Sequence, residues 1–137
     1  MESRLPAIDS PRRSNAATEV LLARPAPGVR SIGEVYMHIA IANFYLLSVT
    51  GAQEPEVSVS MEKTVTQKAD LLDWLKRSLD AVATARAQLK PGDYQRKVSI
   101  DGKVVTVDGM YLRIIVHANE HMGQSIADQI GLYRRSS

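Results

Sequence analysis

Apolar side chains recur at helical spacing in three segments of the chain. The first segment opens with Ser31 and Glu34, an S-x-x-E capping box that predicts a helix beginning near residue 32. Gly51 is placed to end this helix. One stripe of the helix is expected to face the interior, with a histidine in its middle, and consists of Val35, His38, Ala42, Tyr45 and Val49.

A second helix is predicted from about residue 66 to residue 89, where leucines and Val82 recur at helical spacing between basic residues. Pro91 and Gly92 follow it and end the pattern. The segment between the first two helices, residues 52–65, carries Pro55 among alternating polar residues. We expect it to form an ordered loop.

A third helix is predicted from about Gly109 to Ile130, capped by Asp108 and ended by Gly131. Before it, an Asp-Gly pair at 101–102 separates two β-branched runs, which predicts a small hairpin near residues 98–107. Near the N-terminus, prolines leave only residues 15–23 able to be helical. These elements together predict an all-α fold with a β-hairpin insert.

Composition restricts the function classes. A chain of 137 residues is expected to form one domain, and without cysteine it has no disulfide, zinc-thiolate site or thiol nucleophile. The formal net charge is only +2, and residues 1–30 hold five arginines against three acidic residues. Residues 31–137 hold twelve basic and twelve acidic residues, so this part is neutral overall. We therefore expect residues 1–22 to form a basic, flexible segment ahead of a domain over 23–137, with no nucleic-acid partner.

Neither a secretory signal nor a membrane span is predicted. The apolar run near residues 16–23 is interrupted by Thr18 and Glu19. The longest apolar stretch, residues 35–49, is shorter than the roughly 18 to 20 residues of a spanning helix and contains His38 and Asn43. We expect a cytoplasmic protein whose first helix lies in its core.

The candidate chemistry lies in the three histidines of the chain. His117 and His121 are four residues apart, so their rings share one face of the third helix. Such a pair also occurs on solvated faces, and a lone buried histidine such as His38 is commonly satisfied by a carbonyl oxygen. The face itself favours a pocket, because apolar residues give way to polar ones along Met110, Ile114, His117, His121, Gln124 and Asp128.

Taken jointly, His38, His117 and His121 would be costly to bury unpaired, whereas one divalent ion would satisfy all three. A site with three nitrogen ligands keeps positions open for water or substrate, as catalytic sites do. The string HANEH also matches the inverted zincin motif, with Glu120 as general base. That motif needs a ligand far downstream, and only sixteen residues follow His121, so Glu120 is rather an orienting partner or a surface carboxylate.

Two motifs carry a resemblance to a known family. A Pro-Gly-x-Arg-Ser turn leads into a helix with one histidine, and an H-x3-H-x-G-Q signature lies near the C-terminus; the residues are Pro27, Gly28, Arg30, Ser31, His38, His117, His121, Gly123 and Gln124. Over about residues 23–131 the chain resembles the DinB-like superfamily of small helical proteins.

The resemblance implies a four-helix bundle whose three histidines hold a divalent ion, commonly zinc or nickel, and frequently a homodimer. Characterised relatives include S-transferases and isomerases that use low-molecular-weight thiols such as bacillithiol, mycothiol or glutathione. A full first helix usually precedes the Pro-Gly turn, but here that helix is short or missing. The resulting apolar groove is a second reason to expect a homodimer.

The leading hypothesis is therefore a divalent-metal-dependent enzyme in which the ion acidifies a bound thiol or water. Glu34, Gln124 and Asp128 are candidate pocket residues, each one or two turns from a histidine, and Glu120 is a fourth. The alternative is a non-catalytic metal-binding stress protein, which a fourth protein ligand such as Glu34 or Asp128 would favour.

Overall fold

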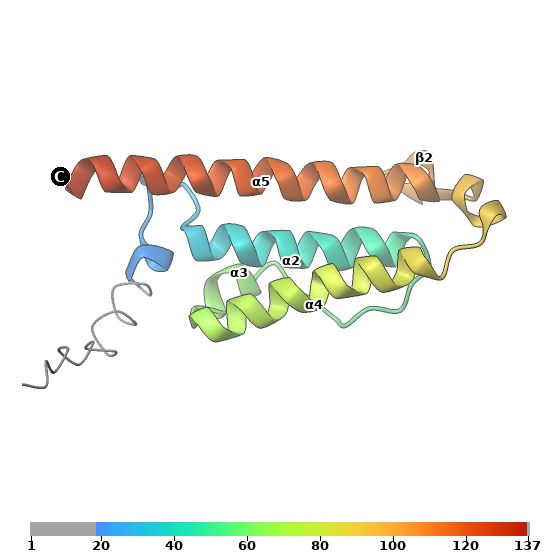
Figure 1. Ribbon diagram of the computed structural model, residues 1–137, viewed down its shortest axis with the longest axis horizontal. Helices are drawn as coiled ribbons and strands as arrows, with labels where there is room; N and C mark the ends of the chain where they lie inside the picture. Colours follow the sequence, from blue (N-terminus) through green and yellow to red (C-terminus); the bar gives the residue numbers. More distant parts are fainter. Residues whose placement is uncertain (1–18, 137) are drawn as a thin grey trace, which may run out of the picture.

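The computed structural model describes residues 19–136 and contains three long helices lying side by side, α2 (Ile32–Val49), α4 (Lys68–Ala87) and α5 (Val107–Ser136). The helix α2 lies between the other two; α4 runs parallel to it and α5 runs antiparallel (Figure 1). Residues 19–22 form a helical turn whose Leu21 packs on the core. The first part of the predicted N-terminal helix, residues 15–18, and most of the predicted flexible segment, residues 1–18, lie outside the described residues.

The predicted capping box at the start of α2 is confirmed. The Ser31 hydroxyl accepts a hydrogen bond from the Glu34 amide, and the Glu34 carboxylate accepts one from the Ser31 amide. At the other end, Thr50 caps the helix and Gly51 has a φ of 95°, a left-handed conformation that favours glycine. The predicted bounds of this helix are therefore right.

The predicted inward stripe of α2 is only partly right. Val35 is fully buried, whereas His38 is partly exposed and Tyr45 is 49% exposed. The helix is apolar on nearly every side, and 67% of its residues are buried. Periodicity alone could therefore not show which side faces outward. It is long and apolar enough to cross a membrane by composition, but here it is the central helix of the bundle.

Residues 52–65 contain a helical turn that the sequence analysis missed, α3 (Met61–Thr64). Met61 packs on the core cluster formed by Met37, Ala40, Ile41 and Leu71. A four-residue helix is too short to show a periodic pattern, so the loop prediction was wrong at this place. The turn matters because it carries Glu62, which is 7% exposed.

Along α4, the apolar residues that fit a helical pattern do not all face inward. Leu71 and Ser78 are buried, but Leu72 and Leu79 are about half exposed, at 50% and 48%. The Ser78 hydroxyl accepts a hydrogen bond from the Asn43 side chain at 3.1 Å, which joins α4 to α2. A buried polar pair thus lies between the two helices.

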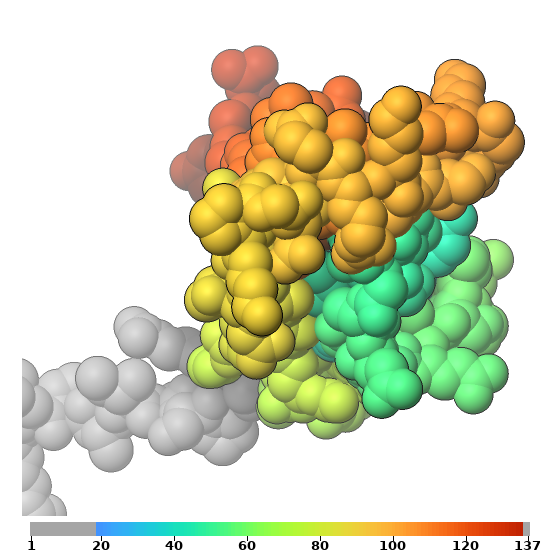
Figure 2. Space-filling model, turned by 90° about the vertical axis from the view of Figure 1, so that its right-hand side faces the viewer, coloured from blue at the N-terminus to red at the C-terminus, as the bar shows by residue number. Residues whose placement is uncertain are grey.

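The predicted hairpin is confirmed. After a 3-10 turn, η1 (Pro91–Gln95), strands β1 (Lys97–Ile100) and β2 (Lys103–Thr106) pair antiparallel. Asp101 and Gly102 both have positive φ, 50° and 72°, as a two-residue turn of this kind requires. Arg96 donates to the Thr50 carbonyl oxygen at 2.6 Å, and the hairpin (orange) lies beside the residues after α2 (green) in Figure 2.

Both predicted ends of the third helix need correction. The helix α5 starts at Val107, and the Thr106 hydroxyl accepts from the Gly109 amide at 3.1 Å, so Thr106 rather than Asp108 caps it. It also continues through Gly131 to Ser136. A glycine ends a helix when the chain turns left-handed there, whereas within a helix it costs only about 1 kcal/mol relative to alanine.

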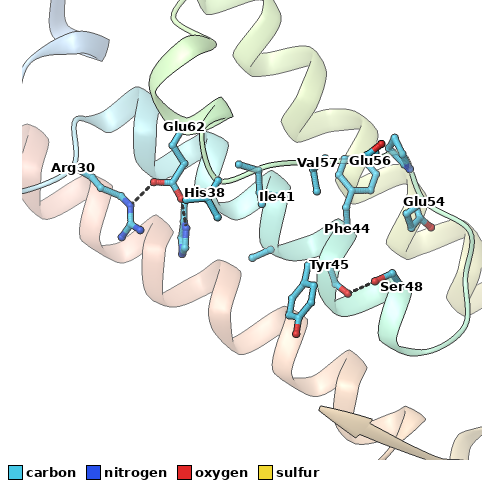
Figure 3. Close-up of a pocket in the computed structure, with 13 residues that line it drawn as sticks. Arg30, His38, Ile41, Phe44, Tyr45, Ser48, Glu54, Glu56, Val57 and Glu62 are labelled. Atoms are coloured by element: carbon cyan, nitrogen blue, oxygen red, sulfur yellow. Dashed lines mark hydrogen bonds and ion pairs between the residues drawn. The ribbon is translucent and has the colours of Figure 1, made fainter. Parts of the chain in front are cut away.

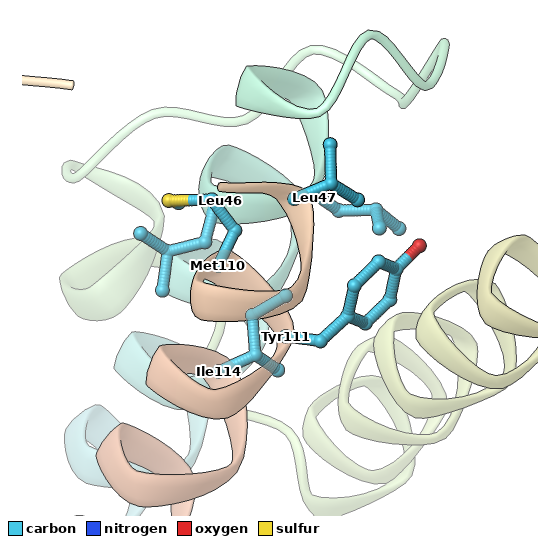
Figure 4. Close-up of a cluster of buried hydrophobic side chains, with 6 residues drawn as sticks. Leu46, Leu47, Met110, Tyr111 and Ile114 are labelled. Carbon is cyan, nitrogen blue, oxygen red and sulfur yellow. The ribbon is translucent and has the colours of Figure 1, made fainter. Parts of the chain in front are cut away.

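The core has two parts, one near each end of α2. The cluster at the hairpin end joins α2 to the start of α5 and consists of Leu46, Leu47, Val107, Met110, Tyr111 and Ile114 (Figure 4). The other cluster joins α2 to α4 through Leu71. Ile114 belongs to the first cluster and Met37 to the second. The packing of these two side chains fixes how α5 is rotated about its axis near His117, and how α2 is rotated near His38.

Candidate metal centre

The antiparallel packing of α2 and α5 brings all three histidines together. Their ring centroids are 5.1 Å apart for His38 and His117, 4.6 Å for His38 and His121, and 4.5 Å for His117 and His121. One nitrogen from each ring lies within 4.8 Å of the other two. Ligands of one ion are roughly 3 to 3.5 Å apart, so binding would draw the rings about 1 Å closer.

The ring of His38 is oriented by a carboxylate from a different element. Its Nδ1 donates to Glu62 Oε1 at 2.6 Å, while Arg30 Nε donates to Glu62 Oε2 at 2.8 Å. Glu62 is therefore held on both oxygens and leaves His38 Nε2 as the nitrogen available to an ion. Metal-binding histidines are commonly held by a carboxylate in this way.

The ring of His121 is oriented from its own helix. Its Nδ1 donates to the Gln124 side-chain oxygen at 2.9 Å, one turn further along α5. This tautomer leaves the lone pair on His121 Nε2. The amide of Gln124 thus acts on its histidine as Glu62 acts on His38.

His117 shows most directly that the residues fit a metal ion. Its Nδ1 is buried and has no hydrogen-bond partner among residues 19–136. Burial lowers the pKa of His117, and the neighbouring His121, His38 and Arg113 lower it further, against a smaller opposing effect of Glu120. The ring is therefore neutral at neutral pH, the form that binds a metal, and an ion would give it the partner that the protein does not supply.

The other predicted pocket residues do not belong to the group of three histidines. Glu34 is buried, but its carboxylate is bound to the Ser31 amide and to Arg24. Glu120 lies on the exposed side of α5, and Asp128 has a buried Oδ2 without a hydrogen-bond partner in the described chain. Among residues 19–136, no carboxylate joins the three histidines as a fourth member of the group.

Sequence reasoning missed Glu62, although it contacts a histidine. It lies 24 residues from His38 in a segment without periodicity. Only the course of residues 52–65 beside α2 brings the two together, and no local pattern encodes that course.

A cavity of about 590 Å³ opens beside His38, between α2 and residues 54–62. Arg30, His38 and Glu62 lie at one end, and Tyr45, Ser48 and Glu54 at the other (Figure 3). Burial raises the pKa of Glu54. The histidine group thus borders a space of the size that small ligands occupy.

Comparison with known proteins places this arrangement in a family. The profile of the DinB superfamily matches residues 11–125, which include all three histidines and Glu62. The chain belongs to the DinB superfamily. A solved structure supports this, the crystal structure of a DinB-like protein from Bacillus cereus ATCC 10987, which superposes with a TM-score of 0.71 at 25% identity.

That alignment covers 81% of this DinB-superfamily chain and 74% of the Bacillus cereus protein. No curated protein matches the chain significantly. The comparisons therefore establish the family and the fold of the bundle, and the chemistry must be argued from the residues of this chain.

Proposed function

We propose that this DinB-superfamily protein is a divalent-metal-dependent enzyme, with zinc or nickel held by His38, His117 and His121. The observation that carries the proposal is the convergence of three imidazoles without a fourth protein ligand among the described residues. A structural zinc site is closed by four protein ligands, whereas three leave a position for a reactant. When bound, the ion supplies a Lewis acid that lowers the pKa of a coordinated thiol or water.

The best-supported reaction is S-transfer from a low-molecular-weight thiol. The chain has no cysteine, so any sulfur nucleophile must come from a cosubstrate such as bacillithiol, mycothiol or glutathione. The sulfur forms a bond to an electrophilic carbon, the leaving group departs with the bonding electrons, and the thiol proton passes to water. Such thiols are kept reduced in the cytoplasm, where we place the protein.

The residues of this chain hold the site ready for that reaction. Glu62 and Gln124 fix the tautomers of His38 and His121, so that each presents Nε2 to the centre. Burial keeps His117 neutral. The cavity beside His38 gives an electrophile a place next to the ligands.

The proposal is tested with metal-reconstituted protein and three thiols, each assayed with monochlorobimane, which loses chloride when a sulfur bonds to it. We expect turnover with at least one thiol and its loss in His117→Ala and His121→Ala. Glu120→Asp is the matched control, because Glu120 is exposed on the same helix and the substitution keeps its charge. If every thiol fails with metal bound, and His117→Ala only lowers the melting temperature, the ion is structural and the protein is a non-catalytic metal-binding protein.

A further inference from the structure

The cavity beside His38 has a predominantly apolar wall. Side chains from one side of α2 and from the segment after it line the cavity, among them Ile41, Ala42, Phe44, Pro55, Val57 and Val59. Figure 3 shows Ile41, Phe44 and Tyr45 along α2, with Val57 across from them. The Ser48 hydroxyl donates its proton to the Tyr45 carbonyl oxygen at 2.6 Å, so it has no second proton to give to a ligand. The wall therefore offers mainly the burial of apolar surface.

The charges around the cavity are unbalanced. Among residues 19–136, Arg30 is the one arginine or lysine that lines it, and Glu62 neutralises that charge through the ion pair at 2.8 Å. Glu54 and Glu56 also line the cavity, and neither forms an ion pair with any residue in 19–136. An anion in this space would meet two carboxylates without a free cation to bind it.

One end of the cavity lies at the metal centre. His38 belongs both to the cavity lining and to the histidine group, and Glu62, which orients it, lines the same end. A molecule filling the cavity would place one end beside His38, one of the three histidines of the group. We propose that this cavity binds the electrophilic substrate, and that this substrate is an apolar small molecule, uncharged or cationic, while anions are rejected. This inference rests on the proposed function and names the substrate class of that site.

Two fluorescent probes with the same apolar body test the substrate class directly. N-phenyl-1-naphthylamine is uncharged, and 1-anilinonaphthalene-8-sulfonate adds one sulfonate to the same ring system. In fluorescence titrations we expect the uncharged probe to bind on the order of tenfold more tightly than the sulfonate. In Glu54→Gln/Glu56→Gln the difference should fall to within about threefold, because the two carboxylates cause it.

Two further variants locate the bound probe. Ala42→Trp fills the cavity from α2 and should weaken the uncharged probe at least tenfold. Val104→Ser removes an apolar side chain from the hairpin strand β2, where it is 69% exposed, and should leave the affinity for the uncharged probe unchanged. If Ala42→Trp does not fold, as shown by circular dichroism, the charge variant decides alone. Equal affinity for both probes in the wild type, or unchanged binding in a folded Ala42→Trp, overturns the proposal.

The titrations use metal-free protein without thiol, so they do not depend on turnover. Thiol transfer without selective probe binding would refute the cavity assignment and leave the proposed enzyme intact. Where turnover is found, the uncharged probe should compete with the electrophile and not with the thiol. Competition with the thiol instead would contradict the assignment.

Discussion

Glu62 on α3 and His38 on α2 are joined through a 2.6 Å contact between Oε1 and Nδ1, across 24 residues of sequence. We expect this contact to set the affinity of the metal centre. Glu62→Ala frees the His38 ring and leaves Arg30 without its partner, so metal affinity should fall about 10- to 100-fold. Glu62→Gln keeps a side-chain oxygen that can accept from His38 Nδ1, so it should lower the metal affinity by less than Glu62→Ala.

A competition titration with a chromogenic chelator measures that affinity, and the absorption spectrum of the cobalt-loaded protein reports the geometry of the ligands. Glu120→Asp serves as the control, because its side chain is exposed on α5 and the substitution keeps its charge. Wild-type affinity in a folded Glu62→Ala variant would show that the carboxylate does not position His38.

Gln124→Ala should separate metal binding from turnover. The amide of Gln124 bonds to His121 Nδ1 at 2.9 Å without belonging to the histidine group. We expect the variant to retain its metal and to lose about tenfold in kcat, because a misoriented ring alters the open position. Kinetics and metal analysis on the same sample check this; simultaneous loss of the ion would mean that Gln124 contributes to affinity instead.

The acid sensitivity of the fold should depend on Glu34. Burial raises the pKa of this carboxyl, but the Ser31 amide, the Arg24 hydrogen bond and nearby positive charge outweigh it, so the pKa lies below 4.5. A lowered pKa stabilises the folded state above pH 4.5, and this contribution is lost as the pH falls through the folded pKa. Glu34→Gln should therefore lower the free energy of unfolding by about 1 kcal/mol at pH 7.

Urea unfolding of the metal-free protein at pH 7 and at pH 3 measures this difference. The difference between the variant and the wild type should shrink at the lower pH, because protonation of Glu34 removes the charge on which its contribution depends. An equal deficit at both values would assign the effect to packing and not to charge.

We propose that the protein is a homodimer through the outer face of α5. Large apolar residues there follow the three-and-four spacing of a helix pair, with Leu112 62%, Ile115 54%, Met122 52% and Ile126 58% exposed. A set of exposed apolar residues along one helix is typical of an interface. Sedimentation at micromolar concentration should give a dimer, and Leu112→Glu/Ile126→Glu a folded monomer. A wild-type monomer would contradict the proposal.

The sequence was most informative where one local rule sufficed. The capping box set the start of α2, and the i,i+4 spacing placed His117 and His121 on one face of α5, so the three-histidine hypothesis needed only that α2 and α5 pack with these histidines facing each other. The Asp101-Gly102 turn was likewise local. Rules of this kind could not reveal Glu62, because the path of residues 52–65 depends on what lies beside them.

The wrong predictions have a shared physical cause. Tyr45 is exposed because neighbouring helices, and not the periodicity of α2, decide which apolar side is buried. Gly131 does not end α5, because a glycine permits a left-handed turn without requiring one. In both cases the pattern allowed two outcomes, and tertiary packing selected one.

The metal content of the purified and reconstituted protein tests the central claim most directly. Elemental analysis of the wild type should find about one zinc or nickel ion per chain after dialysis, and folded His117→Ala should retain less than a tenth of that. A wild-type protein that holds no divalent ion after reconstitution, or a His117→Ala variant that retains a full equivalent, would contradict the account.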